Sequence, residues 1–217
     1  MKDVDQMKYL DFLKTKIEVA PVSGFDLNPD DLNPVLMPHQ RDAVVWALKG
    51  GRRALFESFG LGKTIQELEF CKQVLNHDGG KALIILPLGV RQEFTHDAVE
   101  LLGYEAPQYI THMANADEIE DQSICMTNYE RVRDGDIDPK AFSCCVLDEA
   151  AVLRSFGSKT YQTFLPKFKG VKYKLVATAT PAPNKLKELI HYAGFLVSYL
   201  DAEEEKIDTP TLFDMVM

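Results

Sequence analysis

The chain has 217 residues, of which 46% are hydrophobic and 26% charged, and its formal net charge at pH 7 is −9. This composition is typical of a globular protein rather than a disordered or membrane-embedded one. The negative charge argues against a surface that is basic throughout, although it leaves room for a local basic groove that binds nucleic acid. The longest apolar run, residues 82–90, is too short for a bilayer span of about 20 residues, so we expect no membrane partner.

The cysteines and histidines indicate a reduced protein without a zinc site. No cysteine belongs to a C-x-x-C pair, and the five histidines lack ligand spacing. The amino-terminal residues lack the apolar core that a secretory signal requires. We therefore expect an intracellular protein, cytoplasmic if bacterial or viral and nuclear if eukaryotic, with its cysteines in the core: Cys71, Cys125, Cys144 and Cys145.

The sequence pattern of the first 50 residues predicts an extension followed by a helix. Residues 1–35 are polar, with one expected helix over residues 7–17 and an irregular lead-in rich in Pro and Gly. From Pro38 the apolar residues recur at helical spacing, and the pair Gly50–Gly51 supplies the stop. We assign residues 1–35 to an amino-terminal extension and the following helix to the main domain.

Five short apolar runs then alternate with helical patterns. Continuous apolar runs of this kind are typical of strands covered on both faces. The runs are residues 54–56, 82–86, 124–127, 144–147 and 174–178. Helices are expected after the first run, with Ile65, Leu68, Cys71 and Leu75 on one face, and over about residues 90–102 and 186–200. The pattern predicts an α/β fold, a parallel sheet with helices on both faces, and ligands at the carboxyl ends of its strands.

The segment ESFGLGKT, residues 57–64, connects the first strand to a helix as a phosphate-binding loop does. It meets the pattern G-x-x-x-x-G-K-[ST] except that Glu57 stands in place of the first glycine. Gly60 and Gly62 permit a tight path in which the N–H groups of the loop, including those of Phe59 and Leu61, face one anion. Lys63 can then meet the β- and γ-phosphates of ATP, and Thr64 can bind Mg²⁺. The alternative is a Gly-rich turn with a helix cap.

Two adjacent acids, Asp148 and Glu149, follow the fourth apolar run. Alone, such a pair is more often a helix cap. In a chain with a phosphate loop, Asp148 is expected to hold Mg²⁺ and Glu149 to orient and polarise the attacking water.

Six motifs in order resemble those of Swi/Snf-type ATPases, which belong to helicase superfamily two. The loop resembles DEMGLGKT, in which an acid also holds the first position. The other segments are LMPHQ (36–40), LIILPL (83–88) with Gln92 and Phe94, MTNYE (126–130), DEAA (148–151) followed by RSFGSKT (154–160), and LVATATPAPN (175–184). The likeness covers about residues 36–196.

The resemblance implies a P-loop NTPase, specifically the first of two RecA-like lobes of a DNA-stimulated ATPase that uses ATP and Mg²⁺. It places the lobe at residues 36–200, the strand ending at Thr178 between the two nucleotide-binding strands, and adenine recognition at Gln40. Thr178 and Thr180 would couple the ATP state to DNA. Phosphate contacts to nucleic acid, double-stranded DNA being favoured, would come from Gly89, Gln92, Thr127 and Asn128, which as an alternative could be simple helix caps.

Two departures from the family pattern limit these expectations. Ala151 replaces a histidine that ordinarily touches the coupling threonines, so coupling could be altered. Nothing in the chain supplies the second lobe, whose arginines accelerate phosphoryl transfer by roughly 10³- to 10⁵-fold in analogous enzymes. We therefore expect ATP binding to exceed turnover, with residues 201–217 as an acidic tail or a linker to a missing second lobe.

Two other functions remain open. One is a stand-alone module that binds ATP and a partner without motor activity. The other is a small-molecule kinase, which would leave the acid pair and the T-A-T-P segment unexplained.

Overall fold

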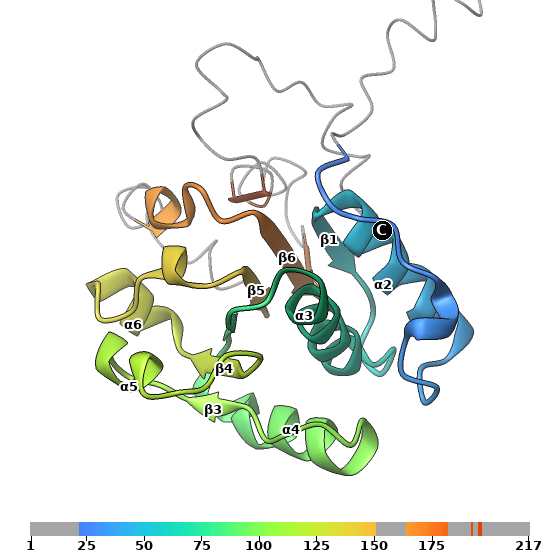
Figure 1. The fold of residues 1–217 in the computed structure, drawn as a ribbon, viewed down its shortest axis with the longest axis horizontal. Coiled ribbons are helices and arrows are strands. Elements are labelled where there is room, and N and C mark those ends of the chain that lie inside the picture. Colours follow the sequence, from blue (N-terminus) through green and yellow to red (C-terminus); the bar gives the residue numbers. More distant parts are fainter. Residues whose placement is uncertain (1–21, 151–163, 182–191, 193–194, 197–217) are drawn as a thin grey trace, which may run out of the picture.

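The computed structural model describes residues 22–150, 164–181, 192 and 195–196, and it contains a six-stranded, fully parallel sheet (Figure 1). The strand order is β1-β6-β5-β2-β4-β3. The strands are β1 (Arg52–Phe56), β2 (Ala82–Ile85), β3 (Gln108–Tyr109), β4 (Ile124–Thr127), β5 (Cys144–Asp148) and β6 (Tyr173–Thr178). The predicted parallel α/β sheet is confirmed.

The position of β6 is the feature that organises the site. This strand pairs with β1 on one side and with β5 on the other, with Thr178 opposite Phe56 and Ala177 opposite Asp148. The strand that ends at Thr178 therefore lies between the strand that enters the phosphate loop and the strand that carries the acids, as the resemblance implies. Because all strands are parallel, the loops after β1, β5 and β6 emerge at the same edge.

One face of the sheet is covered by α2 (Pro38–Gly50), α3 (Lys63–Asp78) and α4 (Arg91–His96), which continues as a π-helix, η3 (Asp97–Leu101). The predicted apolar face of α2 is buried, and so are Leu68, Cys71 and Leu75 of α3. Gly51, in the left-handed conformation at φ 74°, ends α2 as predicted.

The opposite face carries a second apolar cluster, so helices lie on both faces as predicted. Residues of α5 (Met113–Asp117), of α6 (Tyr129–Asp134), of the 3₁₀-helix η5 (Leu165–Phe168) and the helical residues 192, 195 and 196 contribute to it. Another 3₁₀-helix, η4 (Pro139–Ala141), lies beside η5. Two further 3₁₀-helices, η1 (Pro29–Asp31) and η2 (Leu88–Val90), precede α2 and α4.

The strand β3 was missed by the sequence prediction. It has only two residues, Gln108 and Tyr109, and neither is buried. A strand of this length has no period to detect.

Residues 22–35, part of the predicted extension, pack on the lobe. The main-chain N–H groups of Ser23, Gly24 and Phe25 donate to carbonyls at the end of α2 over 3.1 to 3.2 Å. Leu32 is buried in the core under α2 and α3. The predicted helices over residues 7–17 and 186–200 and the tail 201–217 lie outside the described residues, apart from residues 192, 195 and 196. In the part that is described, no helix has the length and apolar character needed to cross a bilayer.

Candidate nucleotide-binding site

The phosphate loop joins the end of β1 to the first turn of α3 at the carboxyl edge of the sheet. Gly60 and Gly62 both adopt left-handed conformations, at φ 82° and 77°. A Cβ on Gly62 would lie 2.3 Å from the side-chain nitrogen of Gln40, so any other residue there would displace that amide and would also have to adopt a left-handed conformation. Lys63 and Thr64 are the first two residues of α3, where unpaired main-chain N–H groups and the helix dipole favour an anion.

Gln40 ties α2 to this loop. Its Nε2 donates to the carbonyl of Leu61 over 3.0 Å, and its Oε1 accepts from the N–H of Met37 over 2.9 Å. The side chain is 5% exposed. The residue predicted to read adenine therefore lies against the loop and fixes its middle.

The side chain of Lys63 folds back onto the main chain of the loop. Its ammonium donates to the carbonyls of Glu57 and Ser58 over 3.2 and 3.3 Å, and it lies 5.4 Å from the ring centre of the exposed Phe59. Glu57 in turn accepts from Gln66 Nε2 over 2.8 Å. The acid in place of the first loop glycine thus has a structural partner in α3.

Asp148 and Glu149 face this loop from the end of β5. Asp148 is 7% exposed, and its burial, followed by the charge of Glu149, raises its pKa to about 7. The nearby positive charge of Lys63 lowers the same pKa, which places the loop lysine and the acid within electrostatic reach of each other. Glu149 has a φ of 47°, a left-handed conformation that is rare outside glycine and asparagine and is concentrated at functional sites.

Glu67 is a residue of this site that the sequence prediction missed. It is fully buried in α3, no N–H or O–H donor among the described residues bonds to its oxygens, and its carboxyl group lies against that of Asp148. Burial, then the charge of Asp148, hold the pKa of Glu67 well above its usual value, while Lys63 lowers it. The detectable signal was its spacing, because positions three and four residues apart share a helix face and Glu67 follows Thr64 and Lys63 at those intervals.

The residues that would hold Mg²⁺ with ATP fit that ion. Mg²⁺ prefers oxygen ligands, retains several waters, and is held through one or two carboxylates plus substrate phosphates. Thr64 supplies a hydroxyl and Asp148 a carboxylate. Within the described ranges no group of three or more His, Cys, Asp or Glu side chains could hold a metal ion unaided. An ion here would therefore depend on phosphate oxygens as well.

The predicted coupling residues lie at the end of β6, between the two halves of the site. Thr178 is fully buried, and its Oγ1 accepts from the N–H of the exposed Thr180 over 3.2 Å. Ala151, the predicted departure from the family pattern, lies outside the described residues.

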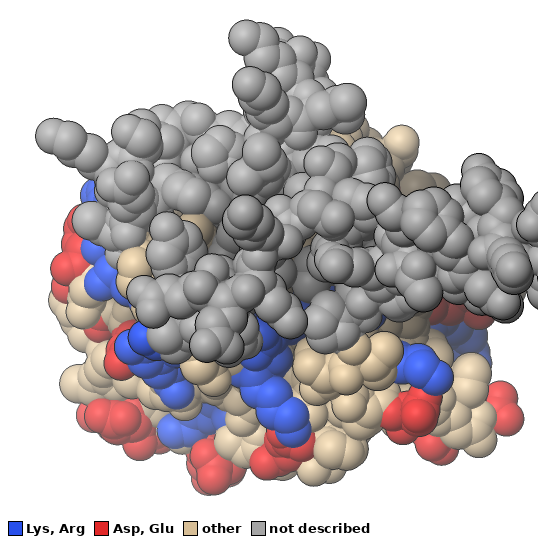
Figure 2. Space-filling model, turned by 90° about the horizontal axis from the view of Figure 1, so that it is seen from above, with Lys and Arg blue, Asp and Glu red and all other residues tan. Residues whose placement is uncertain are grey.

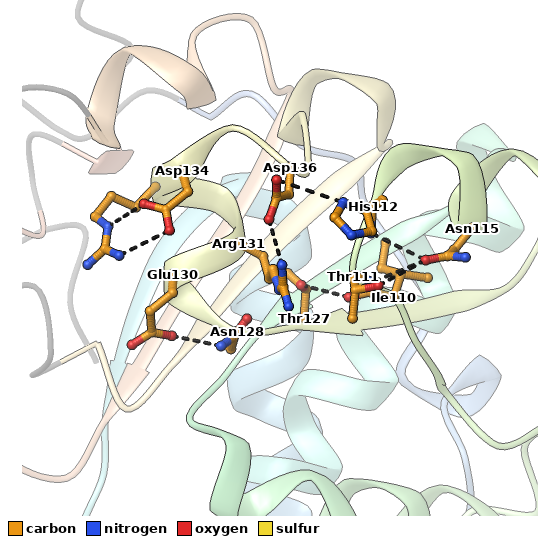
Figure 3. Close-up of polar contacts among 11 residues, drawn as sticks. Ile110, Thr111, His112, Asn115, Thr127, Asn128, Glu130, Arg131, Asp134 and Asp136 are labelled. Carbon is orange, nitrogen blue, oxygen red and sulfur yellow. Dashed lines mark hydrogen bonds and ion pairs between the residues drawn. The ribbon is translucent and has the colours of Figure 1, made fainter.

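The four residues predicted to contact nucleic acid fall into two groups. Gly89 and Gln92 lie exposed in η2 and α4, on the connection that leaves β2. Thr127 is fully buried and its hydroxyl donates to the carbonyl of Ile110 over 2.9 Å, and Asn128 Nδ2 donates to Glu130 over 2.8 Å (Figure 3). The Thr127 hydroxyl and the Asn128 Nδ2 are thus used within the lobe, whereas Asn128 Oδ1 is buried without a hydrogen-bond partner among the described residues.

Comparison with known proteins identifies a family for residues 39–204, which match the model of the SNF2-related domain. The chain is 24% identical over 174 residues to the human DNA annealing helicase and endonuclease ZRANB3, a match that covers 76% of this chain and 16% of that protein. It is 24% identical over 195 residues to Protein CHROMATIN REMODELING 19 of Arabidopsis thaliana, covering 77% of this chain and 26% of that protein. The chain thus spans a minor part of these curated relatives.

Two solved structures share the fold. The Sulfolobus solfataricus SWI2/SNF2 ATPase core in complex with dsDNA superposes with a TM-score of 0.67 at 18% identity, over 88% of this chain and 46% of that one. The UvsW helicase from bacteriophage T4 gives a TM-score of 0.62 at 17% identity, over 88% and 65% of the two chains. Since the family model covers most of the sequence, the chain belongs to the SNF2-related domain family.

Proposed function

We propose that this chain is the ATP-binding lobe of a DNA-dependent ATPase that couples hydrolysis to movement on, or remodelling of, double-stranded DNA. The observation that carries the proposal is the position of β6 between β1 and β5, which brings the loop that holds Lys63 and the acids Asp148 and Glu149 to the same edge of the sheet. A helix cap or a solvated acid pair does not require this convergence, whereas nucleotide hydrolysis does.

In the proposed mechanism the loop N–H groups and Lys63 bind the phosphates of ATP. The ammonium of Lys63 exchanges its two carbonyl partners, Glu57 and Ser58, for phosphate oxygens. Thr64 and Asp148 would hold Mg²⁺, which when bound neutralises charge on the β- and γ-phosphates. Glu149 accepts a proton from the attacking water and orients it. Gln40 binds adenine from α2, where its side chain lies against Leu61 of the loop.

DNA binding is proposed for the turn that leaves β2. Gly89 and Gln92 are exposed there, and the guanidinium of Arg91 lies 5.0 Å from the ring centre of Tyr109. Because the Thr127 hydroxyl is bonded to Ile110, we assign the contribution of Thr127 and Asn128 to main-chain groups. Figure 2 supports a local basic surface on an acidic chain, because Lys and Arg side chains gather between the grey atoms and a lower rim of Asp and Glu side chains.

A second RecA-like lobe, in cis or in trans, is proposed to cover the nucleotide. Phe59, Leu61 and Leu88 are 74%, 41% and 58% exposed on the loops that leave β1 and β2. Exposed apolar side chains beside a polar site are typical of a surface that another domain contacts. We expect this lobe alone to bind ATP and to turn it over slowly.

The decisive experiment is a steady-state ATPase assay of this chain with and without double-stranded DNA, alone and with a candidate second lobe. We expect turnover that rises with both additions and is lost in Glu149→Gln. Nucleotide binding without any turnover, together with full biological activity of Glu149→Gln, would favour a stand-alone ATP- and partner-binding module. Transfer of phosphate to a nucleoside or sugar would instead identify a kinase.

A further inference from the structure

The carboxyl group of Glu67 is the most unusual polar group of the described lobe. It is fully buried, no N–H or O–H donor among the described residues bonds to either of its oxygens, and the side chain that lies against it is another carboxyl group, that of Asp148. In a native structure, a buried polar group without a donor is often explained by a bound ion or water.

The position of Glu67 points to the phosphate end of the nucleotide site. It lies one helical turn after Lys63 and Thr64, on the same face of α3. Helical side chains lean toward the amino terminus of their helix, so this carboxyl is directed back toward the turn that carries those two residues. The charged groups that act on it are Asp148, Lys63 and Glu149, all of which belong to the proposed site.

The charge balance around Glu67 also favours a cation. Glu67, Asp148 and Glu149 are three carboxyl groups, and Lys63 is the positive group among the residues that act on Glu67. If ATP binds, its phosphates take the Lys63 ammonium and add negative charge, so these acids can be accommodated as carboxylates only with a cation. A divalent ion offsets such an excess and offers water ligands that can donate to unsatisfied oxygens.

From these observations we propose that Glu67 is a third protein group of the magnesium site, supplying acceptor oxygens to the hydrated ion that Thr64 and Asp148 hold with ATP. The inference rests on the proposed function, because the ion arrives with nucleotide. The proposal adds to the magnesium site a residue of α3 that lies one helical turn after the phosphate loop.

The test uses a fluorescent, non-hydrolysable ATP analogue whose affinity is measured as a function of Mg²⁺ concentration and, separately, in EDTA. The variant is Glu67→Gln, which keeps the shape of the side chain and removes its carboxylate. The matched control is Glu69→Gln, because Glu69 is equally buried in α3 but accepts from Asn33 N over 3.0 Å and from Gln73 Nε2 over 2.8 Å.

We expect Glu67→Gln to raise the Mg²⁺ concentration that gives half of the affinity gain by roughly 10- to 100-fold, the usual cost of removing a partner of a metal site. In EDTA, where no metal is bound, the affinity of Glu67→Gln for the ATP analogue should stay within about twofold of that of the wild type, because the loss concerns the metal site alone. Glu69→Gln should have the same Mg²⁺ midpoint as the wild type. Electron paramagnetic resonance of Mn²⁺ should show weaker binding of that ion with nucleotide to Glu67→Gln.

Two results would overturn the inference: an unchanged Mg²⁺ midpoint in Glu67→Gln, or an equal loss of affinity in EDTA, which would make Glu67 a residue of the fold alone. Failure of the wild type to bind the analogue at any Mg²⁺ concentration would refute the proposed function itself, and the two failures are therefore distinct.

Discussion

The hydroxyl of Tyr129 donates a 2.6 Å hydrogen bond to the main-chain oxygen of Asp148. Tyr129 begins α6 directly after Thr127 and Asn128, and it is 2% exposed. Burial, then the charge of Asp148, raise the pKa of its hydroxyl well above the usual value, so it remains a neutral donor. This bond links the segment proposed to contact DNA to the strand that carries the proposed magnesium acid.

Tyr129→Phe should therefore weaken the stimulation of ATPase activity by DNA. Loss of one buried hydrogen bond is worth about 1 kcal/mol, or roughly a fivefold change in the ratio of rates with and without DNA. The measurement is that ratio at saturating ATP in the presence of the second lobe. Tyr104→Phe is the control, because it removes a tyrosine bond to Glu69 on the far side of α3. Equal stimulation ratios in both variants would contradict the proposed link.

A comparison of alanine variants at two glycines of the phosphate loop distinguishes the effect of backbone strain from that of a steric clash. Gly60 and Gly62 have nearly the same φ, 82° and 77°, so alanine at either position pays a similar cost of about 1–2 kcal/mol. A Cβ on Gly60 meets nothing within 4 Å, whereas one on Gly62 would displace the Gln40 amide.

We expect Gly62→Ala to lose ATP affinity by at least tenfold more than Gly60→Ala, on the order of 1.4 kcal/mol. It should also lose preference for ATP over GTP, since Gln40 is proposed to read the base. Calorimetric titration with both nucleotides provides the measurement. A loss in Gly60→Ala as large as that in Gly62→Ala would show that strain, and not Gln40, controls the loop.

Lys63→Ala should abolish tight nucleotide binding while changing stability little. Among the described residues, the ammonium of Lys63 donates hydrogen bonds to two main-chain carbonyls, those of Glu57 and Ser58. Charge-assisted hydrogen bonds to phosphate are worth about 1.5–3 kcal/mol each, so we expect roughly a 100-fold loss of ATP affinity. Lys72→Ala, on the same helix and 5.9 Å from the ring centre of Tyr104, should retain affinity. Equal affinity of both variants would contradict the role of Lys63.

The sequence was sufficient for the parts of the lobe in which one physical signal dominates. Continuous apolar runs predicted the five long strands, because both faces of a covered parallel sheet must be apolar. The loop and the acid pair were found because phosphate binding restricts residue type and spacing, and their meeting followed from strand polarity. Conversely, the two residues of β3 carry no periodicity.

The directions in which side chains point could not be predicted from the sequence. Thr127 ends a strand at the correct edge, yet its hydroxyl points inward to Ile110, since an unpaired buried carbonyl is costly. The spacing of Glu67 from Lys63 and Thr64 places it on their helix face, but that spacing does not indicate that its carboxyl group is buried. Its burial depends on β5 delivering Asp148 to the same place, which is a tertiary contact that no local pattern encodes.

Asp148 predicts a pH dependence of stability in the free lobe, without metal or nucleotide. Its pKa is about 7 in the folded protein, against 3.8 for an ordinary aspartate. The folded state thus binds this proton more tightly than the unfolded state. The resulting stabilisation is complete below about pH 4 and is lost as the pH rises through 7.

Asp148→Asn is neutral at every pH and should escape this loss. Its gain in unfolding free energy over the wild type should therefore grow from pH 4 to 7 and level off above, by about 2 to 4 kcal/mol at 1.36 kcal/mol per pKa unit. Urea unfolding in EDTA across pH 4–9 provides the measurement. Asp78→Asn is a control of opposite sign: partial burial raises the pKa of Asp78, but bonds from Lys172 and His77 lower it further, for a net decrease. Asp78→Asn should be less stable than the wild type at neutral pH, and the difference should disappear as the pH falls through the pKa of Asp78. The prediction for Asp148 is contradicted if the stability difference between Asp148→Asn and the wild type is constant with pH, because Asp148 would then be ionised in the free lobe.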